Sequence, residues 1–284
     1  MFKRTSLLTL KHFAQIKGAG QTVRALAAAA AACMVLCAAA GAAQAQVYGS
    51  YNMGCLDNAQ PLALKGDHYV MQIWGRGRNY AHPEMLDYLN KFIERTKAAG
   101  LPDVIIGDLS QKYGGPYAGS NHASHMVGLD VDIPFGFAKD LKDLHKTPDS
   151  FYLVRSGKLT DSFDEDRIKL IYLAAQDERV ERIFVSPRIK EGMCSLFEGK
   201  GDDSFLSKLR PWFGHRAHMH VRLSCPADSP YCKAQAAAPA GTGCGYEVQS
   251  WFMPPDPNAK PAAVKPKPKP VMPQQCKVLL SRQG

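Results

Sequence analysis

The sequence predicts an α+β fold: a single domain with a small, mainly antiparallel sheet flanked by helices. Two stretches have the helical spacing of apolar residues, and five short β-rich stretches alternate with them. The chain has 284 residues, and the roughly 240 that follow the expected signal peptide are enough to bury one full core. The pattern leaves the order of the strands open.

The two helical stretches are residues 82–95 and 163–177. Their apolar residues recur every three or four positions, so they would line one face of a helix. The β-rich stretches are short and contain residues typical of strands. They are residues 69–74, 104–107, 128–133, 182–185 and 219–223.

The first 45 residues have the composition of a secretory signal peptide. They contain five basic residues and no acidic ones, and they lead into an alanine-rich apolar run over about 25–40. The tripeptide at 43–45, Ala-Gln-Ala, matches a cleavage pattern, and an uncleaved anchor or a lipid-modified Cys33 is the alternative. No later stretch is apolar enough to span a bilayer. We therefore expect an exported protein without stable membrane insertion.

Composition divides the mature chain into a globular body, residues 46–255, and a Pro/Lys-rich tail, residues 256–284. The tail contains Lys-Pro-Lys-Pro-Lys-Pro at 265–270, which should be extended and solvated. The body carries 24 basic and 25 acidic residues, and so lacks the basic face that nucleic-acid binding requires. We expect one domain with a C-terminal strap and no nucleic-acid partner.

Six of the eight cysteines belong to the mature chain. An even number of cysteines in an exported chain predicts three disulfides. Zinc binding by these thiols is the competing interpretation, but the chain has no Cys-x-x-Cys pair and the spacings are wide and irregular. Proximity in sequence favours one pair, Cys225 with Cys232, and leaves the other pairings open.

Five of the nine histidines fall within residues 120–132 and 215–220. His218 and His220 are two residues apart in an expected strand, so their side chains project from the same face while Met219 faces the core. An isolated His-x-His is weak evidence, because a histidine on a strand is more often a hydrogen-bonded surface or core residue. The residues at 120–132 are therefore needed as additional evidence for a metal site.

The first cluster adds carboxylates to the imidazoles. Asp132 follows His125 after six residues, and Asp130 shares the face of Asp132 on an expected strand. A catalytic zinc takes three histidine or carboxylate ligands and leaves one position to water. His125, Asp132 and His220 supply this set, so the two motifs together predict a zinc site at one end of the sheet. A structural hydrogen-bond network is the alternative.

Two strings of residues carry a resemblance to a known family. Residues 119–133 read Gly-Ser-Asn-His-Ala-Ser-His-Met-Val-Gly-Leu-Asp-Val-Asp-Ile, and residues 210–223 read Arg-Pro-Trp-Phe-Gly-His-Arg-Ala-His-Met-His-Val-Arg-Leu. Both closely resemble the penicillin-insensitive murein endopeptidases, which are similar to the wider lysostaphin and D-Ala-D-Ala metallopeptidase group. The resemblance extends over essentially the whole mature chain, including Ile-Phe-Val-Ser-Pro at 183–187.

The resemblance implies a role for each residue of the two clusters. His218 would be the catalytic base, and His215 would be a further site residue that steadies the transition state. In the resulting mechanism, His215 or the nearby Arg216 would hydrogen-bond the developing oxyanion, and a surface ion pair is the alternative role for Arg216. His122 matches a further position of the family motif, three residues before His125 on a shared helical turn, and would bind metal or lie next to it. The implied metal ligands are thus His122, His125, Asp132 and His220.

The resemblance also bears on a second metal, on the disulfides and on the substrate. Family members can carry Asp-Gly-Lys-His where this chain reads Ser-Gly-Lys-Leu at 156–159, so a second zinc is not expected. Trp212 is expected to line the substrate site because its motif flanks the predicted metal ligands, and a place in the core is the alternative, since aromatic residues near a strand are usually buried there. The implied disulfides are Cys55 with Cys276, Cys194 with Cys244, and Cys225 with Cys232.

The implied function is zinc-dependent hydrolysis of D-alanyl-meso-diaminopimelate cross-links in peptidoglycan, carried out in the periplasm. Such an enzyme is insensitive to penicillin because no serine is acylated, and the sequence contains no Ser-x-x-Lys motif. The first alternative is a D-Ala-D-Ala carboxypeptidase, which could use the same zinc ligands. The second is a non-catalytic wall-binding protein, and the position of His218 beside His220 argues against it.

Overall fold

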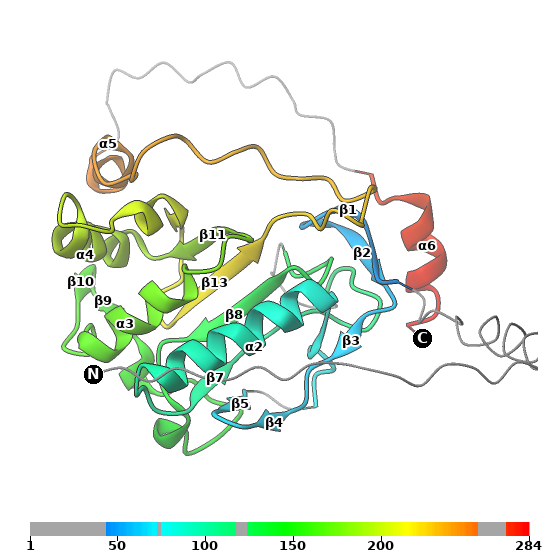
Figure 1. Cartoon of the computed structure of the whole chain (residues 1–284), viewed down its shortest axis with the longest axis horizontal. Coiled ribbons are helices and arrows are strands. Elements are labelled where there is room, and N and C mark those ends of the chain that lie inside the picture. Colours follow the sequence, from blue (N-terminus) through cyan, green and yellow to red (C-terminus); the bar gives the residue numbers. More distant parts are fainter. Residues whose placement is uncertain (1–43, 73–74, 118–123, 255–270, 284) are drawn as a thin grey trace, which may run out of the picture. The chain divides into compact units, whose positions relative to one another are not determined.

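A four-stranded sheet lies at the centre of the computed structural model, which describes residues 44–72, 75–117, 124–254 and 271–283. Its strands are Leu209–Pro211 (β12), Val180–Val185 (β11), His218–Leu223 (β13) and Asp130–Pro134 (β8). They are ordered β12, β11, β13, β8 (Figure 1). β13 is antiparallel to both of its neighbours, and the edge strand β12 is parallel to β11. This confirms the predicted α+β fold with a mainly antiparallel sheet.

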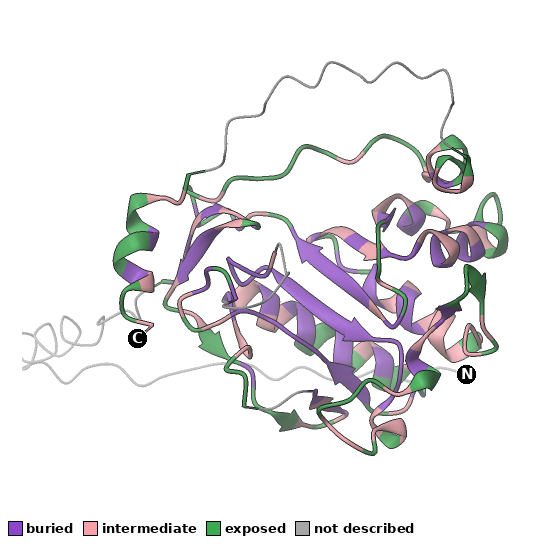
Figure 2. Ribbon diagram, turned by 180° about the vertical axis from the view of Figure 1, so that it is seen from behind, coloured by how far each residue is buried: buried purple, intermediate pink, exposed green. Residues whose placement is uncertain are grey.

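Alternation of apolar and polar residues gives the sheet two different faces. Val131 and Ile133 of β8, with Met219 and Val221 of β13, are fully buried in the main core. The polar residues between them belong to the opposite face. Figure 2, seen from behind, shows both strands as buried along almost their whole length, so much of the polar face is also shielded from solvent.

Three helices cover the apolar face of the sheet: Pro83–Ala98 (α2), Glu165–Ala174 (α3) and Pro187–Phe197 (α4). α2 begins after His82, whose Nδ1 accepts the backbone N–H of Glu84 at 3.2 Å. Its buried Leu89 and Phe92 contribute about 2 kcal/mol each to stability. α4 was not predicted, because Lys190 interrupts its apolar pattern although that side chain is buried.

A second, smaller sheet fixes the position of β8. It contains Lys65–Gly66 (β4), Tyr69–Met71 (β5) and Val104–Ile106 (β7), with β5 and β7 parallel. Just after β7, the backbone N–H of Gly107 donates to the carbonyl of Asp132 at 2.8 Å. A Cβ on Gly107 would lie 3.0 Å from that carbonyl oxygen, so glycine permits the close approach.

The remaining elements are short and surround this framework. The seven predicted helices and strands are all present, with ends shifted by a few residues, and Trp74 of the first predicted strand lies outside the described residues. The others are Gln46–Ser50 (β1), Met53–Asp57 (β2), Gln60–Pro61 (β3), Tyr80–Ala81 (β6), Val154–Arg155 (β9), Lys158–Leu159 (β10), Tyr246–Gln249 (α5), Gln274–Leu280 (α6), and 3-10 turns at Ala138–Asp140, Asp149–Phe151, Ser204–Lys208 and Ser250–Phe252.

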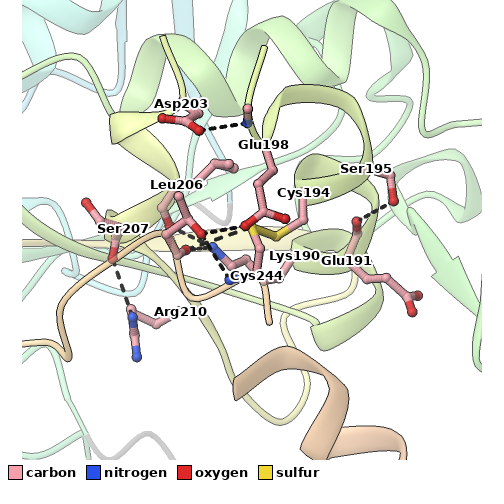
Figure 3. Close-up of a disulfide and its surroundings, with 12 residues drawn as sticks. Lys190, Glu191, Cys194, Ser195, Glu198, Asp203, Leu206, Ser207, Arg210 and Cys244 are labelled. Atoms are coloured by element: carbon pink, nitrogen blue, oxygen red, sulfur yellow. Dashed lines mark hydrogen bonds between the residues drawn. A yellow bond between two sulfur atoms is a disulfide. The ribbon is translucent and has the colours of Figure 1, made fainter. Parts of the chain in front are cut away.

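Three disulfides join the pairs that the family resemblance implies: Cys55 with Cys276, Cys194 with Cys244, and Cys225 with Cys232. The second links α4 to the segment before α5 (Figure 3). Beside it, the Nζ of Lys190 donates to the carbonyl of Leu206 at 2.7 Å and also to a second backbone carbonyl, that of Thr242. Burial and the nearby Arg210 lower the pKa of Lys190 to about 8.

Several expectations fall on residues outside the described ranges. Nearly all of the expected signal peptide does so, as does the Lys-Pro run at 265–270. Beyond that run the chain forms helix α6, which was not predicted. None of the helices in the described ranges is both long and apolar enough to cross a membrane.

Candidate metal centre

The pairing of β8 with β13 brings the two predicted clusters together. In this antiparallel register, His220 lies opposite Asp132 and Arg222 lies opposite Asp130. The Oδ1 atom of Asp132 is 3.1 Å from Nδ1 of His220. Both side chains are almost fully buried. Neighbouring strands thus place a carboxylate and an imidazole in contact on the polar face of the sheet.

His125 reaches the same point from the loop that precedes β8. Its backbone N–H donates to Oδ2 of Asp130 at 3.1 Å, and its Nε2 is 3.3 Å from Oδ1 of Asp132. The ring is fully buried and stacks on Tyr117, with 6.0 Å between ring centroids. Its φ of +66° is left-handed, a region where histidine is enriched among residues other than glycine.

The expected helical turn from His122 to His125 is described only at its end, where His125 has the left-handed φ of +66°. His122 itself lies outside the described residues. Its place among the metal ligands therefore remains a prediction.

The donor atoms of His125, Asp132 and His220 suit a zinc ion. One ligand atom from each residue lies within 4.8 Å of the other two. Zinc bonds of about 2.0–2.2 Å in tetrahedral geometry separate ligand atoms by about 3.4 Å. The distances from Asp132 Oδ1 to the two imidazoles, 3.1 and 3.3 Å, are close to that value. Two imidazoles and a carboxylate are also a known donor set of catalytic zinc sites.

Asp130 holds His220 in the orientation that this set requires. Nε2 of His220 donates to Oδ1 of Asp130 at 2.9 Å, which leaves Nδ1 facing Asp132. Nε of Arg222 donates to the same oxygen at 2.7 Å, and its Nη2 donates to the other at 3.3 Å. A carboxylate behind a ligating histidine fixes the ring and its tautomer. The alternation Asp-x-Asp with His-x-His-x-Arg would have revealed both partners in the sequence.

The acidic and basic side chains at the centre favour each other's charged forms. Burial alone would raise the pKa of Asp132, but His125 and His218 outweigh it and hold that pKa well below its ordinary range. Burial would likewise lower the pKa of His220, but Asp130 raises it to about 9. The carboxylate of Asp132 is therefore ionised at neutral pH, as a metal ligand must be. Metal binding at His220 would release its proton.

Two further histidines lie near this centre without belonging to it. Nε2 of His218 is 3.8 Å from Oδ1 of Asp132, and its side chain is 37% exposed. The ring centroid of His215 is 5.2 Å from that of His218. Nδ1 of His215 donates to the carbonyl of Phe213 at 2.7 Å. Burial, and to a smaller extent the charge of His218, lowers the pKa of His215 to about 4, so the ring is neutral at pH 7.

A pocket of about 590 Å³ opens beside the centre. His215 and His220 line it together with Phe184, Trp212 and Trp251. The predicted residue Trp212 is 52% exposed there. Phe184 and Trp251 were not predicted: the first reads as an ordinary strand residue, and the second is far away in the sequence.

The chain also resembles known proteins over most of its length. The model of the penicillin-insensitive murein endopeptidase family matches residues 47–281. The chain belongs to this family. Curated relatives of that name include those of Haemophilus influenzae (42% identical, over 84% of this chain and 83% of that protein), Escherichia coli O9:H4 (41%, 83% and 86%) and Salmonella newport (42%, 83% and 86%). These matches confirm the resemblance of the two sequence strings to the penicillin-insensitive murein endopeptidases. The chain is a peptidase that acts on peptidoglycan.

Proposed function

We propose that this family member is a zinc-dependent endopeptidase that hydrolyses D-alanyl-meso-diaminopimelate cross-links of peptidoglycan. The observation that carries the proposal is the convergence of His125, Asp132 and His220 at one buried point beside a large pocket. These side chains come from a loop and two neighbouring strands, so only the fold brings them together. The curated relatives described above are named penicillin-insensitive murein endopeptidases, which agrees with an endopeptidase acting on peptidoglycan.

Each residue of the centre has a chemical task in this proposal. His125, Asp132 and His220 hold the ion, and Asp130 keeps His220 oriented toward it. A zinc ion bound there supplies Lewis acidity for the attack of water on an amide carbonyl. His218, which is half-buried beside Asp132, takes a proton from the attacking water and passes it to the leaving nitrogen.

His215 suits a different task from the one expected. Its Nδ1–H is donated to the Phe213 carbonyl, so the neutral ring presents Nε2 as a hydrogen-bond acceptor. An oxyanion needs a donor, whereas a substrate N–H or a water hydrogen needs an acceptor. We therefore propose that His215 positions substrate or water, with Trp212 packing against the substrate in the same pocket.

We also propose that the protein binds one zinc ion per chain and acts in the periplasm. Within the described ranges, His125, Asp132 and His220 are the single group of three ligand residues close enough to hold an ion. Residues 156–157 form the turn between β9 and β10, and residues 158–159 belong to β10. The basic, alanine-rich start of the chain supports export through a cleaved signal peptide.

Product analysis of digested sacculi tests this function. Purified mature protein should convert cross-linked muropeptide dimers into monomers, and added penicillin should not slow the reaction. His220→Ala, prepared in the same way, is the control for contaminating hydrolases. Release of terminal D-alanine from pentapeptides without loss of dimers would instead establish the carboxypeptidase alternative.

A further inference from the structure

A second, smaller pocket borders the metal centre at Asp132 and His218, neither of which lines the large pocket. Its volume is about 190 Å³, enough for a carboxylate with a few carbon atoms. Gln72, Arg76 and Thr147 belong to its wall. The pocket therefore places one arginine close to the proposed site of hydrolysis.

Arg76 belongs to a cluster with a surplus positive charge. Its Nη2 donates to Oδ1 of Asp108 at 2.6 Å, and Nη1 of Arg78 donates to Oδ2 of the same carboxylate at 2.9 Å. Two guanidinium groups share one carboxylate, so the three side chains together carry a net charge of +1. Asp108 is buried, and the guanidinium of Arg78 lies over the ring of Tyr117, 3.8 Å from its centroid. Arg76, whose side chain is 35% exposed, presents the surplus charge to the pocket.

The backbone ties this cluster to the metal centre. The N–H of Asp132 donates to the carbonyl of Asp108 at 3.0 Å, next to the bond from Gly107 to Asp132. Asp108 therefore connects Arg76 to a proposed zinc ligand through two hydrogen bonds. An arginine anchored in this way has fewer conformations to lose when it binds an anion than a free surface side chain has.

The proposed substrate carries a carboxylate next to its scissile nitrogen, where Arg76 could reach it. In a D-alanyl-meso-diaminopimelate cross-link, the scissile nitrogen is bonded to a carbon that also carries a free carboxylate. His218, to which the proposed function assigns the leaving nitrogen, lines the same pocket as Arg76. A guanidinium binds a carboxylate through two parallel hydrogen bonds, which gives both affinity and orientation.

We propose that Arg76 forms an anion subsite that binds the carboxylate adjacent to the scissile nitrogen and so selects cross-links in which that carboxylate is free. This inference rests on the proposed function. The same chemistry would be presented by the terminal carboxylate of a D-Ala-D-Ala peptide, and we assign the subsite to the cross-link.

The test compares two cross-linked stem-peptide dimers that differ only in whether this carboxyl group is free or amidated. The wild-type protein should cleave the free acid with a kcat/KM about 10- to 100-fold above that of the amide, the range expected for one charged hydrogen-bonded contact. Arg76→Gln should lower kcat/KM for the acid to the level of the amide and change the amide by only a few fold. Arg76→Lys should retain part of the preference. The ratio of the two rates on one sample does not depend on the folded fraction.

Arg188→Gln is the matched control. Its side chain is 36% exposed and paired with Glu191 at 2.8 Å, much as Arg76 is paired with Asp108, but it lines neither pocket. It should keep the wild-type preference. A wild-type protein with no preference, or an Arg76→Gln variant that loses both activities equally, would overturn the subsite. Faster cleavage of a D-Ala-D-Ala pentapeptide would overturn its assignment to the cross-link, and cleavage of no substrate would overturn the proposed function as well.

Discussion

The metal centre and the C-terminal helix are held in place by different means. Strand register places Asp132 opposite His220, and His220 also hydrogen-bonds to the buried carboxylate of Asp130, which Arg222 holds in turn. Helix α6 buries only Cys276 and Leu279, and a disulfide to Cys55 attaches it to β2. This fold therefore positions its polar site through the sheet, and uses a covalent link where little apolar area is available.

The two regions also belong to separate apolar clusters. The strands of the centre share the main core with α2, whereas Cys55, Cys276 and Leu279 form a small cluster of their own with Tyr48 and other partly buried neighbours. Damage to one region should therefore leave the other largely intact. Substitutions in each region can test this independence.

Substitution of the centre should abolish activity and distinguish ligand from base. His220→Ala and Asp132→Ala should lose both bound metal and activity, because each removes a ligand. His218→Ala should keep the metal and lose about 10²- to 10⁴-fold in kcat, because a general base acts on water and does not hold the ion. Metal analysis and digestion assays on the same samples check this. An empty site in His218→Ala would mean that the roles of the two histidines are exchanged.

Asp130→Asn should weaken metal binding about 10- to 100-fold without removing a ligand, because the amide no longer fixes the His220 ring as a carboxylate does. Competition with a chelator of known affinity measures this. Asp177→Asn is a suitable control, since Asp177 is similarly buried and paired with Arg179 at 2.8 Å, away from the centre. It should lower the free energy of unfolding by about 2 kcal/mol and leave metal affinity unchanged. Equal metal affinities in the two variants would refute the role of Asp130.

Removal of the disulfide that holds α6 should affect stability far more than activity. In the loop-entropy model, Cys55→Ser with Cys276→Ser lowers the free energy of unfolding by about 5 kcal/mol, and Cys225→Ser with Cys232→Ser by about 2.5 kcal/mol, because the second loop is much shorter. Urea denaturation measures both. Metal content and turnover per folded molecule should stay within about twofold of the wild type. A metal-free but folded variant would show that the strap and the centre are coupled.

Sequence periodicity predicted the parts of the molecule in which each residue has a clear preference for one face. The alternation of apolar and polar residues predicted β8 and β13 and placed Asp132 and His220 on their polar faces, whereas His125 was predicted from its spacing to Asp132. Register could not be predicted, because pairing of β8 with β13 depends on the packing of the whole core. The contact between Arg76 and Asp108 was not predicted either, because it joins residues 32 apart and has no periodic signature in the sequence.

Metal analysis of the purified mature protein, combined with digestion of sacculi by the same sample, tests the central claim most directly. With His125, Asp132 and His220 as ligands, the protein should contain about one zinc ion per chain, lose cleavage on exhaustive chelation and regain it when zinc is added back. Full cleavage of cross-links by a sample shown to be free of metal would contradict the claim.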